Sequence, residues 1–394
     1  MNGPAQLLSH APDHILVPLL ERCSADLRGA ILAGTHGADR RVVDAVITRG
    51  SPVLRHTLAA NQALAPEDLE RLADRADGRT AWRLALHPRV HRDLMVRVMA
   101  VADPGRALLD SRPYDRTRHE QYALVESPDA AYVVHGLRGI FRDGTLADRA
   151  VVLRAGHNLL RLLGPERGHA TFARHGTTLG KKEADVVARA FRHPDGPGIM
   201  HRLSTFKARK RPLIAQLRRH DTMWLSDEPT GYRPPSLLHP SGLHLLLLAP
   251  HVLGWDELMR CDAQLRWGTV ATLTLGDQPG CPDEFRARAD VVRADPRTTG
   301  VAADPARVLT PWWFRVPPGP TAATLAGVPP PPPAPPALRP YEHLTPEARA
   351  HALGTLAAAS LGDRIDAWLV ALRLLPDFPG SLPELLDTST RATV

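Results

Sequence analysis

The sequence predicts an all-α protein built from short helices that stack in pairs. Apolar residues recur at a spacing of 26 or 27 positions, and turn-forming residues recur between them at the same spacing. Neither helix of such a pair can bury its apolar face alone, so a core forms only when neighbouring pairs stack. A chain of 394 residues, 43% of them apolar, is long enough to form an extended array of this kind.

The first set of recurring positions lies in residues 27–105. Three consecutive segments can be aligned there: 26–52, 53–78 and 79–105. The aligned apolar columns are Ile31, Leu58 and Leu84; Val42, Leu69 and Met95; and Ala45, Leu72 and Val98. The joints are Gly50-Ser51-Pro52, Asp77-Gly78 and Asp103-Pro104-Gly105. We therefore predict a first array of helical repeats over 27–105, preceded by an N-terminal cap over 1–26.

Each unit of this pattern is typical of two short helices. The first helix is rich in Ala and Leu and ends at Asn61, His87 or Asp277, residue types that tolerate a turn. Pro66 or Pro282 then takes the first position of the second helix, where its missing N–H has no intrahelical partner to lose. Acidic residues follow in the first turn, where the helix dipole favours negative charge.

The same pattern returns in residues 245–316, which we predict to be a second array. There Leu247, Leu258 and Leu265 stand 27 positions before Thr274, Phe285 and Val292. The run Thr269–Leu275 alternates Thr with aliphatic residues as a strand does, but it falls inside the repeat frame. We therefore expect it to be a helix.

These residues resemble the leucine-rich-repeat-variant family, whose units carry an Ala-rich helix, an Asn-Pro turn and a second segment led by proline. His87-Pro88 and Asp304-Pro305 keep the proline of the turn, whereas Gln62 replaces it. Similar patterns occur in HEAT-like and armadillo-like solenoids. The resemblance implies a curved, right-handed α-solenoid that serves as a binding surface.

The founding type of that family also carries an iron–sulfur cluster on clustered cysteines, which this sequence does not offer. Cys23, Cys261 and Cys281 are too scattered for such a cluster, for a disulfide framework or for a compact metal site. We therefore expect no cofactor, no bound metal and a reducing compartment. The longest apolar stretch, near Leu243–Trp255, is interrupted by His and Pro and is too short to cross a membrane. The sequence predicts a cytoplasmic protein without a membrane partner.

Outside the two arrays the helix signals have no clear period. Residues 106–244 are expected to form an irregular helical region, in which Ser127-Pro128-Asp129 begins a helix with Ser127 as the N-cap. Residues 317–340 include eleven prolines and are expected to be a linker. Residues 341–394 are expected to form a C-terminal helical cap, with a capping box at Ser381 and Glu384.

Positive charge is concentrated in residues 181–220. Eleven basic and three acidic side chains there give +8, whereas the whole chain carries +7. All four lysines of the chain lie in this segment, so the arginine-rich composition typical of a GC-rich, bacterial-type genome does not explain the concentration. The candidate anion-binding residues are Lys181, Lys182, Arg202, Lys207, Arg209, Lys210, Arg211, Arg218 and Arg219. Such a segment attracts a polyanion; the alternative is a solvated loop whose cations pair with acids elsewhere in the fold.

Sequence motifs for catalysis are missing: we find no glycine-rich phosphate loop, GxSxG or HExxH. The sequence therefore favours a non-catalytic scaffold that binds a macromolecular partner, with protein as the expected class and no small-molecule substrate. The alternative is a nucleic-acid-binding solenoid that uses residues 181–220. A more specific form of this alternative is a HEAT-like DNA glycosylase, with Trp312, Trp313 and either Asp304 or Asp295 in the active site.

Overall fold

The computed structural model of this protein describes residues 3–33, 39–113, 116–140, 146–175, 179, 181–204, 214, 217–218, 247–248, 254–294 and 346–393. Every regular element within these ranges is a helix, which confirms the all-α prediction. None of the helices described has the length and hydropathy that crossing a membrane requires. The chain divides into two compact units: Met1–Arg83 together with Val316–Val394, and Leu84–Arg315.

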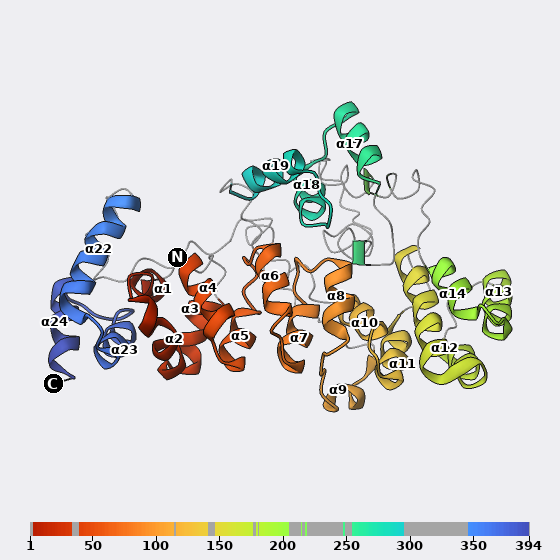
Figure 1. Cartoon of the computed structure of the whole chain (residues 1–394), viewed down its shortest axis with the longest axis horizontal. Helices are drawn as coiled ribbons and strands as arrows, with labels where there is room; N and C mark the ends of the chain where they lie inside the picture. The colour runs from red at the N-terminus through yellow and green to blue at the C-terminus, as the bar shows by residue number, and fades with distance from the viewer. Residues whose placement is uncertain are drawn as a thin grey trace, which may run out of the picture. The chain divides into compact units, whose positions relative to one another are not determined.

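The first unit is a series of short helices from both ends of the chain (Figure 1). Its helices are α1 (Gly3–Leu8), α2 (Asp13–Arg22), α3 (Ala25–Leu32), α4 (Arg40–Arg49), α5 (Pro52–Leu58), α6 (Pro66–Ala73), most of α7 (Gly78–Ala85), α22 (Pro346–Leu361), α23 (Ile365–Leu374) and α24 (Leu382–Arg391). α2 packs on α4, α3 on α5 and α4 on α6. A helix thus packs against the next but one along the chain.

The C-terminal helices of the first unit pack against its N-terminal helices. α23 contacts both α1 and α2, and α22 contacts α1, as the blue and dark red helices of Figure 1 show. Trp368 of α23 is fully buried, and its indole N–H donates to the carbonyl of Gly362 at 2.9 Å. The segment that we expected to be a terminal cap therefore lies against the first two helices of the chain.

Local helix signals in the first unit are confirmed. α6 begins at Pro66 with Glu67 and Asp68 in its first turn. α24 begins with the expected capping box, in which Glu384 accepts from the backbone N–H of Ser381 at 2.7 Å.

The second unit contains the remaining helices. These are α8 (Arg92–Met99), α9 (Ala107–Asp110), α10 (Arg118–Val125), α11 (Ala130–Gly139), α12 (Leu146–His175), α13 (Lys181–Arg192), α14 (Gly196–Ser204), α17 (Trp255–Gln264), α18 (Thr269–Gly276) and α19 (Asp283–Ala294). α10, α11 and α12 pack on one another, α13 and α14 pack on α12, and α18 packs on α19. α18 confirms that Thr269–Leu275 is helical rather than extended.

α12 is interrupted at Gly164, which has a positive φ of 77°. Only glycine adopts this conformation readily, and Pro165 follows it, so the helix breaks there and continues in a new direction. Gly136 of α11 allows a close approach instead: a Cβ at this position would lie 2.7 Å from the carbonyl oxygen of Gln121 in α10. Gly136 thus allows α11 to pack closely on α10, and Gly164 allows α12 to break.

All nine members of the first set of apolar columns are buried, each with at most 5% of its surface exposed. At the turns between them, Asn61 Oδ1 accepts from the N–H of Ala63 at 2.9 Å, and His87 Nδ1 accepts from the N–H of Arg89 at 3.1 Å. The Asn61 amide also donates to the carbonyl of Leu32, 29 positions earlier. The turn residues thus close the turn through their own side chains.

Three details of the sequence prediction are wrong. The N-cap of α11 is Asp129, which accepts from the N–H of Ala131, whereas Ser127 lies before the helix and bonds the N–H of Asp129. Pro282 precedes α19, and its carbonyl accepts the first N–H groups of that helix. Leu265, expected to be buried like Leu258, is 61% exposed because it follows α17 in an extended conformation.

Candidate functional site

The predicted basic segment is only partly described. Lys181 and Lys182 form the start of α13, and their side chains lie outside the description. Arg202 on α14 is exposed and forms an ion pair with Asp195 at 3.0 Å. Lys207, Arg209, Lys210, Arg211 and Arg219 lie outside the described residues. Arg218 is the other candidate residue whose side chain the structure describes.

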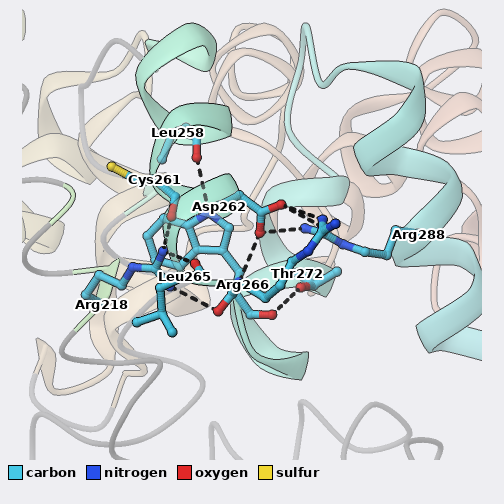
Figure 2. A network of polar contacts seen from close by, with 9 residues as sticks. Arg218, Leu258, Cys261, Asp262, Leu265, Arg266, Thr272 and Arg288 are labelled. Atoms are coloured by element: carbon cyan, nitrogen blue, oxygen red, sulfur yellow. Dashed lines mark hydrogen bonds and ion pairs between the residues drawn. The ribbon is translucent and has the colours of Figure 1, made fainter.

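Arg218 is bound to the end of α17 rather than presented to solvent. Its guanidinium lies over the ring of Trp267, 3.6 Å from the centroid. It also donates to the carbonyl oxygens of Cys261 at 2.6 Å, Arg266 at 3.1 Å and Leu265 (Figure 2). These carbonyls belong to the last turn of α17 and the residues that follow it, where the helix dipole favours a cation. The charge of Arg218 thus stabilises a helix C-terminus.

Asp262 is the centre of the same network and is nearly inaccessible, with 2% of its side chain exposed. Arg288 of α19 binds it with two parallel bonds of 2.6 and 2.9 Å. Arg266 donates a third at 3.0 Å, and the backbone N–H of Trp267 a fourth at 3.0 Å (Figure 2). Asp262 thereby fastens α17 to α19 and fixes the chain that leads into α18.

The electrostatics of Asp262 fit this structural role. Burial alone would raise the pKa of its carboxyl, but the bonds from Arg288 and from the N–H of Trp267 outweigh burial and hold the pKa below its ordinary value. The carboxylate is therefore ionised at neutral pH with its oxygens already occupied. Such a group stabilises the fold and is not poised to exchange a proton with a substrate.

A second buried carboxylate, Glu126, lies at the end of α10 and is 2% exposed. Arg92 of α8 donates to its Oε1 at 2.5 Å, and Arg154 of α12 donates to its Oε2 at 3.0 Å. Asn158, one turn after Arg154, donates to the carbonyl of Val125 at 2.6 Å. Burial alone would raise the pKa of Glu126, but the two arginines hold it below its ordinary value. Glu126 thus joins three helices through charge.

The other buried carboxylates are used in the same way. Asp148 accepts from the hydroxyl of Tyr122 at 2.6 Å and from Arg118 at 2.9 Å. In the first unit, Asp68 accepts from Arg40 at 2.7 Å and from Arg71 at 3.1 Å. Asp68 was expected only to favour the N-terminus of its helix; in the structure it links α4 to α6.

Three acid–arginine pairs have a spacing close to that of the repeat, and sequence reasoning missed them. Asp44 and Arg71 are 27 positions apart and 2.5 Å from each other. Glu126 and Arg154 are 28 positions apart. Asp262 and Arg288 are 26 apart. The apolar columns recur every 26 or 27 positions. A search for an acid followed by an arginine 26 to 28 positions later would therefore have included these three pairs.

No set of three His, Cys, Asp or Glu side chains in the described residues is arranged to hold a metal ion. Cys23 and Cys281 are buried, and burial raises the pKa of each thiol to about 11. The residues considered for a glycosylase active site, Trp312, Trp313, Asp304 and Asp295, lie outside the description.

We compared the chain with protein-family models, with curated proteins and with solved structures, and none of them matched.

Proposed function

We propose that this protein is a non-catalytic scaffold of stacked helical repeats, arranged as a right-handed α-solenoid, that binds a protein partner. The observation that carries the proposal is how the buried charge is used. Asp68, Glu126, Asp148 and Asp262 are each bound by arginine, in several cases from a helix about one repeat away. Pairs that recur at this spacing, together with the nine buried column residues, support a repeated unit that stacks on its neighbours. Repeat arrays of this kind offer extended surfaces that suit a macromolecule.

The test is isolation and reconstitution of a complex. The full chain, immobilised through a C-terminal tag, is incubated with a cell extract that has been treated with nuclease. We expect one protein to be retained, and to form a complex of fixed stoichiometry with the purified chain in size-exclusion chromatography. A chain unfolded by heat and cooled is the control bait. Retention that disappears with nuclease, or that the unfolded bait reproduces, contradicts the proposal.

The second candidate is a nucleic-acid-binding solenoid, favoured by the net charge of +8 in residues 181–220. On α13 of that segment, Arg189 and Arg192 are exposed and available to phosphate. Arg218 supports the first candidate instead, because its guanidinium already binds Trp267 and backbone carbonyls.

Duplex DNA distinguishes the two. If residues 181–220 bind phosphates, log affinity falls with log salt between about 50 and 200 mM at a slope of roughly −0.9 per phosphate contacted. The quadruple variant Lys207→Ala, Arg209→Ala, Lys210→Ala and Arg211→Ala then loses that binding. A control variant removes the same charge from exposed arginines elsewhere: Arg79→Ala, Arg83→Ala, Arg161→Ala and Arg167→Ala. An equal loss of DNA affinity in both variants indicates that net charge alone attracts the DNA. Absence of DNA binding at low salt excludes the nucleic-acid candidate.

A further inference from the structure

The second unit contains a groove between α9, α11 and the part of α12 around its break at Gly164. Its volume is about 410 Å³, within the range of small-molecule sites. α11 lines it with Ala130, Ala131, Val134 and Arg138, spaced so that they share one helix face. The alanines are too short to fill the space, which is why a groove remains there. Leu163 and Thr171, on either side of the break at Gly164, form the opposite wall.

Among the described residues that line this groove, Arg138 is the charged one. Arg138 is exposed, and within the described residues its partner is the ring of His175, at 3.3 and 3.4 Å, rather than a carboxylate. Burial and the neighbouring Arg138 and Arg174 lower the pKa of His175, so this ring is neutral at pH 7 and cancels none of the arginine charge. A guanidinium in this setting favours an anion.

His135 adds an unused hydrogen-bonding group. It lines the groove and is only 5% exposed, and its Nε2 has no hydrogen-bond partner among the described residues. Burial, with Arg116 and Arg138 nearby, lowers the pKa of this imidazole and keeps it neutral. A buried nitrogen without a partner is unfavourable, and a bound acceptor is one of the few ways to satisfy it.

We propose that this groove binds a small monocarboxylate with an apolar body. The carboxylate accepts hydrogen bonds from Arg138, and it accepts a further one from His135 after a rotation of the ring toward the groove. The apolar body lies against Leu109, Val134 and Leu163. A carboxylate suits the groove better than a phosphate because Arg138 is a single cation and most of the lining is apolar. The site is independent of any protein partner, so it goes beyond the function proposed above.

The probe is 4-phenylbutyrate, titrated into the full chain by calorimetry and by saturation-transfer NMR. We expect a dissociation constant of about 1 mM or lower, as befits a ligand of this size. The matched probes 4-phenyl-1-butanol and 4-phenylbutylamine keep the apolar body but lack the negative charge. We expect each to bind about tenfold more weakly or not at all.

Two variants test the assignment from opposite sides. Arg138→Ala removes the cation and should weaken 4-phenylbutyrate binding about tenfold while leaving the alcohol unaffected. Val134→Trp fills the groove, keeps Arg138 and should abolish binding of all the probes. The control Arg161→Ala removes an exposed arginine of α12 that does not line the groove, and should bind as the wild type does.

The proposal is overturned if no binding of 4-phenylbutyrate is detected at a concentration about 10 times the expected dissociation constant. It is also overturned if the alcohol binds as tightly as the acid, or if Arg138→Ala and Arg161→Ala change the affinity for 4-phenylbutyrate equally. Circular dichroism of each variant establishes that it is folded. If Val134→Trp does not fold, Ala131→Leu, on the same face of the helix, replaces it with the same expectation.

Discussion

Replacing Glu126 by glutamine tests whether buried charge holds α8, α10 and α12 together. The substitution keeps the volume of the side chain and one carbonyl oxygen but removes the negative charge. Arg92 and Arg154, each with 13% of the side chain exposed, are then left as neighbouring cations with little water to solvate them. Breaking a buried ion pair on one side costs about 3–5 kcal/mol. Because glutamine still accepts one hydrogen bond, we expect a loss of about 3 kcal/mol.

The assay is urea unfolding followed by circular dichroism, combined with hydrogen exchange. The chain has two compact units, so the exchange rates of backbone amides in α10 and α12 localise the effect where a single unfolding transition would not. Glu166→Gln is the matched control: Glu166 is exposed on α12, and its substitution should change stability by less than about 0.5 kcal/mol. The reasoning is refuted if Glu126→Gln is as stable as this control.

The pH dependence of the same variant supplies an independent check. The folded-state pKa of Glu126 lies below its ordinary value of 4.5 because the attraction of Arg92 and Arg154 outweighs burial. The stability that this carboxylate contributes is therefore present above pH 4.5 and lost as the pH falls through the folded-state pKa. The difference between wild type and Glu126→Gln should shrink in that acidic range. A difference that stays constant would show that shape, and not charge, is responsible.

Three further predictions follow from other buried groups. Asp262→Asn should cost about 3 kcal/mol, because Asn cannot balance the charge of Arg288, and it should shift the tryptophan emission to longer wavelength as α17 to α19 loosen. His157 has a pKa lowered to about 4, chiefly by burial and then by Arg154. On acidification the unfolded chain therefore takes up a proton at this imidazole at a higher pH than the folded chain does. Stability should therefore fall as pH drops from 6.5 toward 4, by about 2 kcal/mol after allowance for solvent screening, and His157→Gln should remove that part of the slope. Iodoacetamide at pH 8 should modify Cys261, which is partly exposed, at least about tenfold faster than Cys23 and Cys281, whose thiols have pKa values of about 11, as peptide mass spectrometry would show.

The helices were predictable from the sequence because their signals are local. Pro66 and the capping box at Ser381 mark helix starts through interactions within a few residues, and both are found as expected. In the first array the spacing of the apolar columns predicted which side chains are buried, whereas in the second array it failed at Leu265. At Ser127 the local signal was ambiguous, because Asp129 two residues later is an equally good cap and begins the helix instead.

The roles of the charged residues were not predictable in the same way. Asp68 and Arg218 each have a satisfactory local explanation, as a helix N-terminal acid and as one cation of a basic run. Their partners, Arg40 and the carbonyl of Cys261, lie 28 and 43 positions away. An acid or an arginine on a helix has the same sequence signature whether it faces water or a neighbouring helix, so only the packing decides.

This difference between local and distant signals bears directly on the choice between the two proposed partners. In an arginine-rich chain, a count of cations overestimates the charge offered to a ligand, because guanidinium groups such as those of Arg154, Arg218 and Arg288 bind acids and carbonyls within the fold. The case for a nucleic-acid surface therefore rests on the cluster at Lys207, Arg209, Lys210 and Arg211, where four cations fall within five residues. If the quadruple alanine variant of this cluster has the same salt-dependent DNA affinity as its charge-matched control, net charge and not this cluster attracts the DNA, and a protein partner is the better explanation of the surface.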